Sequence, residues 1–98
     1  MQLFDQALDA QRNGKFQEAE LLYRRILAND SRNFDALHML GIVCAETAKF
    51  SEAEEIFRAA LSIDPKYPPC YHNFGLFFVK LKRYQEAINS LTERWLLF

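Results

Sequence analysis

Glycine, proline and cysteine are scarce in this chain of 98 residues, with three, three and two copies respectively. So few glycines and prolines argue against a fold rich in tight turns and favour long helices. Two cysteines are too few for a disulfide scaffold, and both Cys44 and Cys70 lie in apolar helical patterns that predict buried free thiols. The chain also lacks an excess of either charge, since 12 basic and 13 acidic residues leave a net charge of −1. This balance gives no electrostatic reason to expect nucleic acid or an acidic membrane as a partner.

Long apolar runs are absent as well. No stretch approaches the roughly 20 apolar residues that a membrane-spanning helix needs. The first part of the chain has no continuous apolar run of the kind found in signal peptides. We therefore expect a soluble, cytoplasmic protein without a membrane partner. Hydrophobic residues nevertheless make up 50% of the chain and aromatic residues 14%, which is enough for a core.

What the chain does contain is a motif that returns at a constant spacing. The letters FQEA at 16–19 return as FSEA at 50–53 and as YQEA at 84–87, each time after a basic residue. Large apolar side chains follow at the same offsets in every copy. We call this spacing the repeat period. A period of about 34 residues indicates stacked helical repeats, in which no single unit can bury its apolar face alone.

Apolar residues within each copy are spaced by three and four positions, as on one face of a helix. We expect Ser51 and Glu54 to form a capping box at the start of one helix, Asp64-Pro65 to end that helix, and Pro68-Pro69 to begin the next. Gly41 leaves room for neighbouring helices to approach closely, as does Gly75. The expected helices lie near 1–13, 17–29, 34–47, 51–63, 69–81 and 85–97.

Taken together, these residues resemble the tetratricopeptide repeat. The middle copy carries the clearest signature: Leu37, Leu40-Gly41, Phe50, Ala53, Phe57, Ala60 and Pro65. The resemblance covers essentially the whole chain and implies an all-α domain over residues 1–98. Its repeats would span about 1–33, 34–67 and 68–98, as three antiparallel hairpins stacked in a short right-handed superhelix.

In this family the first helices of the hairpins line a concave groove that binds peptides. The resemblance therefore implies a peptide-binding groove formed by Phe4, Asp5, Leu8, Gln11, Arg12, Asp35, His38, Met39, Ile42, Glu46, His72, Asn73, Leu76, Val79 and Lys80. The apolar members suit an amphipathic helix or an extended peptide with apolar anchors. Leu8, Ile42 and Leu76 fit a role in the core equally well, whereas we expect Phe4 and Met39 to be exposed.

Family members that bind the acidic tails of chaperones carry a clamp of lysine, asparagine, asparagine, lysine and arginine. At the corresponding positions this chain has Phe4, Leu8, Met39, Pro69 and Asn73. None of the clamp residues is present, so the sequence does not predict chaperone-tail binding.

Other chemistry has little support in the sequence. His38 and His72 occupy equivalent positions one repeat period apart, but two ligands without a third make a weak metal site. We therefore expect no metal and no cofactor, and histidines that are exposed or contact the peptide. No serine or cysteine has a base and an orienting group at a suitable spacing, so we expect no enzyme activity.

Two alternatives to a peptide-binding scaffold stay open. The apolar end at Trp95, Leu96 and Phe98 could join two copies into a homo-oligomer. In addition, residues 17–27 and 34–41 are similar to the opening repeats of bacterial tetratricopeptide proteins, many of which are fused to glycosyltransferase-like domains. The chain would then be the targeting part of a larger protein.

Overall fold

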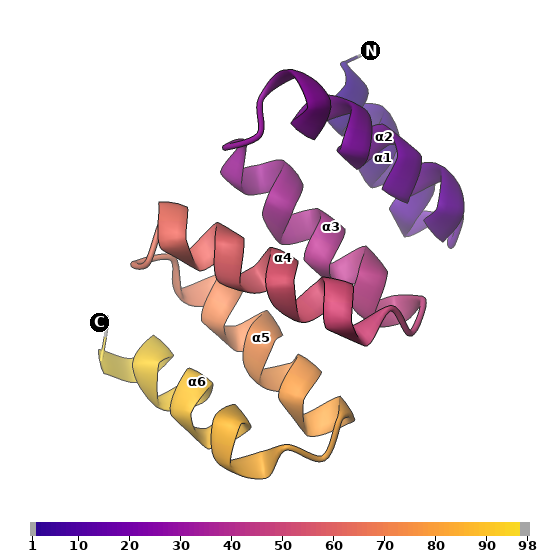
Figure 1. Cartoon of the computed structure of the whole chain (residues 1–98). Helices are drawn as coiled ribbons and strands as arrows, with labels where there is room; N and C mark the ends of the chain where they lie inside the picture. Colours follow the sequence, from indigo (N-terminus) through magenta and orange to yellow (C-terminus); the bar gives the residue numbers. More distant parts are fainter. Residues whose placement is uncertain (1, 97–98) are drawn as a thin grey trace.

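The computed structural model describes residues 2–96, and for Tyr84 and residues 92–96 it describes the backbone alone. Short turns join the helices of this part of the chain (Figure 1), which contains no strand. Each helix lies where the apolar spacing predicts one, and its ends differ little from the expected ones. The helices are α1 (Leu3–Arg12), α2 (Phe16–Asn29), α3 (Phe34–Glu46), α4 (Phe50–Ile63), α5 (Pro68–Lys80) and α6 (Tyr84–Leu96).

Consecutive helices pair as antiparallel hairpins, which we call the first (α1 and α2), the second (α3 and α4) and the third (α5 and α6). The hairpins follow one another along the molecule (Figure 1), whose principal extents are 38, 24 and 20 Å. Within the described residues, the expected class of an all-α stack of three hairpins is confirmed. No helix in this part of the chain combines the length and the apolar character that crossing a bilayer requires.

The turn inside each hairpin has the same backbone conformation. Gly14, Ala48 and Lys82 stand one repeat period apart, and all three have positive φ angles, of 76°, 62° and 61°. In every copy the next amide donates a hydrogen bond of 2.8 Å to the carbonyl five residues earlier. Glycine adopts this left-handed conformation freely, whereas a side chain costs about 1–2 kcal/mol there. The second and third turns therefore retain strain that the first avoids.

Glycine also sets how closely the two helices of a hairpin approach. A Cβ atom on Gly41 of α3 would lie 2.9 Å from the ring of Phe57 on α4. A Cβ atom on Gly75 of α5 would lie 2.9 Å from the side chain of Leu91 on α6. Both distances are shorter than a real contact allows, so the expected close approach at these glycines is confirmed.

The start of α4 differs from the expected capping box. The helix begins at Phe50 with Lys49 as its N-cap, and no side chain caps it. The amide of Ala53 already donates to the Lys49 carbonyl at 2.9 Å, which places Ser51 inside the helix. Glu54 is paired with arginines on α4 and in the third hairpin instead. The other boundary predictions are confirmed, since α4 ends just before Asp64-Pro65 and α5 begins at the predicted prolines.

Ion pairs join successive hairpins at equivalent positions. The Lys49 ammonium lies 2.9 Å from a carboxylate oxygen of Glu20, and Arg83 makes the equivalent pair with Glu54 one hairpin later. Burial raises the pKa of Glu20, but the hydrogen bonds and charges of Lys49 and Arg24 outweigh it and hold that pKa below its usual value. Hydrogen bonding from Arg83 lowers the pKa of Glu54. The basic residue before each of these two repeat motifs thus binds the preceding hairpin.

Candidate functional site

The predicted groove residues lie on the first helix of each hairpin, α1, α3 and α5, at different depths. Among the described side chains of this set, seven are exposed: Asp5, Arg12, Asp35, Glu46, Leu76, Val79 and Lys80. Another seven are half-buried: Phe4, Leu8, Gln11, Met39, Ile42, His72 and Asn73. The expectation that Phe4 and Met39 are exposed is wrong, because both pack against the hydrophobic core. His38 is buried.

A hollow of about 110 Å³ lies between α3 and α5. It is lined by Ile42, Ala45, Glu46, Phe57, Asn73, Leu76, Phe77 and Lys80. Five predicted groove residues therefore meet at one place: Ile42, Glu46, Asn73, Leu76 and Lys80. The predicted residues on α1 do not line this hollow, which belongs to the second and third hairpins.

Apolar and polar groups occupy different parts of this hollow. Phe57 and Phe77 are buried and provide an apolar floor. Leu76 lies at the side of the hollow and is 51% exposed. Lys80 reaches across from α5 and donates a hydrogen bond of 3.3 Å from Nζ to the Ala45 carbonyl on α3. The hollow can accept one apolar side chain, while polar groups around it can bind the backbone of a peptide.

His38 differs most from its expected role. Its side chain is 7% exposed, and its Nε2 atom lies 2.9 Å from Nδ2 of Asn73 on the next hairpin. The ring lies against Phe34, with centroids 5.9 Å apart, and against Tyr67, at 5.6 Å. Burial lowers the pKa of His38, with Asp35 acting in the opposite direction. The prediction of an exposed histidine is therefore wrong for His38, because α5 and the connection between α4 and α5 cover its ring.

Sequence reasoning missed this aromatic cluster around His38. Tyr67 belongs to the connection between α4 and α5, and its ring also meets the edge of Phe34, with centroids 5.1 Å apart. The available signal was the location of Tyr67 directly before Pro68-Pro69, where the chain turns back towards α3. Its partner Phe34 begins α3, so the cluster joins two helix starts.

In the described part of the chain, the side chains form no metal-binding cluster, and the two thiols are buried. No cluster of three or more His, Cys, Asp or Glu side chains suited to a metal ion occurs there. Cys44 and Cys70 are both buried and free, as the apolar pattern predicts. Burial raises the pKa of the Cys44 thiol and raises that of Cys70 to about 12. Neither thiol is therefore a reactive thiolate near neutral pH.

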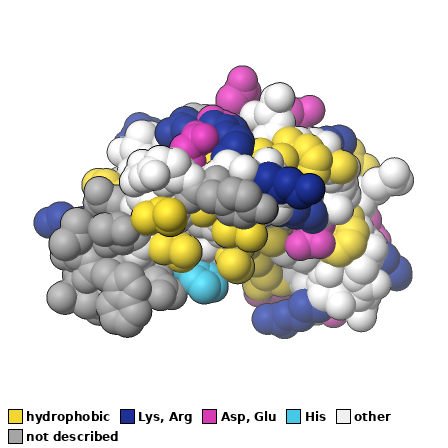
Figure 2. Space-filling view, turned by 90° about the horizontal axis from the view of Figure 1, so that it is seen from below, with side chains coloured by type: hydrophobic (Ala, Val, Ile, Leu, Met, Phe, Trp, Pro, Cys, Tyr) yellow, Lys and Arg dark blue, Asp and Glu magenta, His cyan; other side chains and the backbone are white. Residues whose placement is uncertain are grey.

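The predicted self-association edge is at the end of α6. The side chains of Trp95 and Leu96 and the whole of Phe98 lie outside the described residues. Figure 2 views the molecule from the side where α6 lies and shows hydrophobic side chains exposed between charged ones. Ile88 on α6 is 57% exposed. It stands one repeat period after Glu54, at the position where the first two hairpins carry the glutamate of the ion pair.

Comparisons with known proteins agree with this architecture. Family models described as tetratricopeptide repeat match residues 4–68 and 68–93. No curated protein sequence matches the chain.

Among solved structures, Pseudomonas aeruginosa pilF is 28% identical with a TM-score of 0.89, over 94% of this chain and 41% of that one. A Thermobaculum terrenum O-GlcNAc transferase mutant is 29% identical with a TM-score of 0.91, over 97% of this chain and 18% of that one. The chain therefore spans less than half of either protein. The second repeat domain of Spaghetti (RPAP3), bound to the HSP90 peptide SRMEEVD, has a TM-score of 0.89 over 98% of this chain and 89% of that one. At 23% identity this last likeness shows the fold alone.

Proposed function

The chain belongs to the tetratricopeptide repeat family, and we propose that it is a protein-interaction scaffold that binds a peptide segment between α3 and α5. The observation that carries this proposal is the hollow of about 110 Å³ with exposed Leu76 at its side. An apolar side chain of the peptide would enter the hollow and cover Leu76. Burying such surface contributes about 25 cal/mol per Å² before the costs of association are subtracted.

Polar groups around the hollow give the peptide its expected chemistry. Glu46 and Lys80 supply one charge of each sign, and Asn73 has an amide oxygen that can accept from a peptide N–H. Such a rim suits a peptide without a strong net charge. It does not suit an acidic chaperone tail, because four of the five clamp positions carry Phe4, Leu8, Met39 and Pro69, whose side chains cannot donate a hydrogen bond to a carboxylate.

The test uses peptides selected from a random display library against the whole chain. Fluorescence anisotropy then measures the affinity of each selected peptide for the wild type and for Leu76→Glu. We expect Leu76→Glu to weaken binding at least tenfold, since it places a charge where an apolar side chain must pack. Leu21→Glu is the matched control, because Leu21 is 67% exposed on α2, away from the hollow. Equal affinity of the wild type and Leu76→Glu for every selected peptide would contradict the proposal.

A second candidate function follows from one specific likeness. The T. terrenum O-GlcNAc transferase mutant matches nearly the whole chain at 29% identity. We propose on this basis that the chain can serve as the repeat part of a larger glycosyltransferase-like protein, where it would present substrates. The mass of the intact protein isolated from its source decides this, because a species of 11.5 kDa alone would exclude it.

A further inference from the structure

At one repeat position on the second helices, the third hairpin has a small polar side chain where the first two have an aliphatic one. Leu22, Ile56 and Ser90 are equivalent residues of α2, α4 and α6, each one repeat period after the last. Leu22 is 9% exposed and belongs to the core, and Ile56 is partly buried against the core. Ser90 is equally inaccessible, at 8% exposure, but much smaller. The third hairpin therefore lacks an aliphatic side chain where the other two have one.

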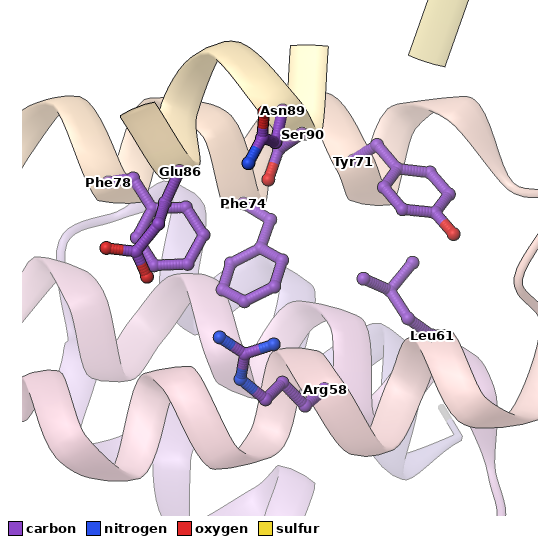
Figure 3. A pocket seen from close by; sticks show the side chains of 8 residues that line it. All are labelled: Arg58, Leu61, Tyr71, Phe74, Phe78, Glu86, Asn89 and Ser90. Atoms are coloured by element: carbon purple, nitrogen blue, oxygen red, sulfur yellow. The ribbon is translucent and has the colours of Figure 1, made fainter. Parts of the chain in front are cut away.

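A hollow of about 280 Å³ lies beside this serine, between α4, α5 and α6. Figure 3 shows the ring of Phe74 at its centre, with Ser90 of α6 on one side and the guanidinium of Arg58 on the other. Phe78 and Tyr71 stand along α5 on either side of Phe74. This hollow is distinct from the one between α3 and α5, because it opens between the two second helices.

Aromatic side chains, the cation of Arg58 and the carboxylate of Glu86 define the chemistry of this hollow. The Arg58 guanidinium carbon lies 5.3 Å from the centroid of the Phe74 ring, within the range of a cation–π contact. Arg58 is also paired with Glu54 at 3.1 Å, and the Glu86 carboxylate lines the same hollow, so an anion gains little there. Ser90 adds a hydroxyl group that can both donate and accept a hydrogen bond. The best-matched ligand is a neutral aromatic ring with one polar group.

The size of the hollow agrees with this ligand. An apolar cavity of about 150 Å³ accommodates benzene, and the present hollow is larger and open to solvent. A ring placed in it would pack against the half-buried Leu61 and Tyr71, with the Tyr71 ring at the usual centroid distances of about 4.5–7 Å. Phe74 and Phe78 are only 3% and 2% exposed, so they form the base of the hollow. The hydroxyl or N–H group of the ligand would meet Ser90 on one side, with Arg58 on the other.

We propose that the hollow between α4, α5 and α6 binds a phenol or indole ring. The ring can belong to a free aromatic compound or to a tyrosine or tryptophan side chain of a protein partner. The inference does not depend on peptide binding between α3 and α5, since the two hollows have different openings.

Phenol is the first probe, with cyclohexanol as a probe of similar size that has a hydroxyl group but no π system. Backbone amide chemical shifts of the whole chain are followed by NMR during each titration. We expect phenol to shift amides near Arg58, Phe74 and Ser90, and cyclohexanol to bind at least several-fold more weakly. Equal binding of the two probes, or shifts spread evenly over the chain, would overturn the proposal.

Ser90→Ile places in the third hairpin the side chain that the second has at Ile56. We expect it to fill the hollow and weaken phenol binding at least tenfold. Ser62→Ile makes the same substitution at an exposed serine of α4 and should leave binding unchanged. Should Ser90→Ile fail to fold, Arg58→Met answers the same question, because Arg58 is exposed and its removal leaves the core intact. A folded Arg58→Met variant that binds phenol as well as the wild type contradicts the proposed site.

A peptide arm separates the two sources of the ring. The blocked peptides acetyl-Ala-Tyr-Ala-amide and acetyl-Ala-Leu-Ala-amide are titrated in the same way. Shifts at the hollow with the tyrosine peptide alone support a protein partner, and shifts with phenol alone support a free aromatic compound. Binding of the leucine peptide at the same strength as the tyrosine peptide contradicts an aromatic site.

Discussion

The junction between the first and second hairpins differs from the junction between the second and third, although both follow the same register. Two ion pairs cross the first junction, Glu20 with Lys49 and Arg24 with Glu52, and among the described side chains Glu54 pairs with Arg83 across the second. The apolar residues between them are different. On α3 the inner positions are occupied by small or aliphatic side chains such as Leu40.

The second junction is built mainly from aromatic rings. Phe57 of α4 packs against Phe74 and Phe77 of α5, with centroids 5.4 and 5.8 Å apart, and Phe78 packs against Phe74 at 4.4 Å. Flat, rigid rings cannot adapt their shape as a leucine or isoleucine does. With Ser90 beside them, they leave a hollow of about 280 Å³. A shared register therefore fixes where helices meet, while side-chain shape decides whether the junction is closed.

The largest effect is expected from removing the ring that links both sides of the second junction. Phe57 is 1% exposed, so Phe57→Ala should lower the free energy of unfolding by about 3–5 kcal/mol. Urea unfolding followed by circular dichroism measures this. Tyr23→Phe in the first hairpin keeps its ring and removes only the hydrogen bond to Gln11, so it should cost about 1 kcal/mol. A loss below about 1 kcal/mol for Phe57→Ala would show that the rings do not hold the junction.

The next effect concerns the His38–Asn73 contact, which crosses the second junction. Burial holds the pKa of His38 below its usual value, so the unfolded chain takes up the proton at a higher pH than the folded chain does. The stability from neutral His38 is therefore complete above about pH 6.5 and is lost as the pH falls through the lower folded pKa. Unfolding free energies measured from pH 7.5 to 5 should fall more steeply for the wild type than for His38→Gln. If the free energies of unfolding of the two proteins fell equally with pH, His38 would not be the cause of the loss of stability.

A smaller effect, and a gain, is expected in the turns. Ala48→Gly should stabilise the chain by up to about 1 kcal/mol, since glycine relieves the positive φ of 62°. Lys82→Gly offers the same test in the third hairpin, where φ is 61°. Gly14→Ala should have the opposite effect, although a Cβ atom there would meet nothing within 4 Å. Melting temperatures of the three variants check the prediction, and a destabilised Ala48→Gly variant would contradict it.

Removing an inter-hairpin ion pair should have the smallest effect on stability, and the effect should be similar at the two junctions. Glu20→Gln and Glu54→Gln each remove one inter-hairpin pair. In both pairs the basic side chain is more than a third exposed, at 44% for Lys49 and 37% for Arg83. Ion pairs that solvent reaches in this way contribute little and are screened by salt. We expect similar, slight decreases in melting temperature at low ionic strength, which disappear near roughly 1 M salt. A much larger loss for one variant would show that its junction depends on charge rather than on packing.

Much of the fold could be predicted because the repeat period imposes the same physical requirements on every hairpin. The helices, the close approach at Gly41 and the buried thiols all follow from local spacing and side-chain size. The capping box at Ser51 was wrong, because α4 begins one residue earlier, at Phe50, and Glu54 pairs with Arg58 and with Arg83, which lies far away in the sequence. Local motifs give no information about such distant competitors.

The candidate site was predictable in its helices and less so in its side chains. Five predicted residues meet at the hollow between α3 and α5, as the shared helix positions suggest. His38 has the same repeat position as His72 but is covered by Tyr67 and bonded to Asn73. Equivalent positions therefore do not ensure equal exposure, because neighbouring connections differ between hairpins.

The register is encoded in the amino-acid sequence: which residues form helices, which helices pair, and which small residues permit close contact. Those properties depend on neighbours three or four positions away and on a period that is visible in the letters. Tertiary structure alone decided that His38 is buried, that Glu54 binds the third hairpin, and that a hollow remains beside Ser90. These outcomes depend on how side chains from different hairpins fill shared space, and a linear pattern does not specify shared volume.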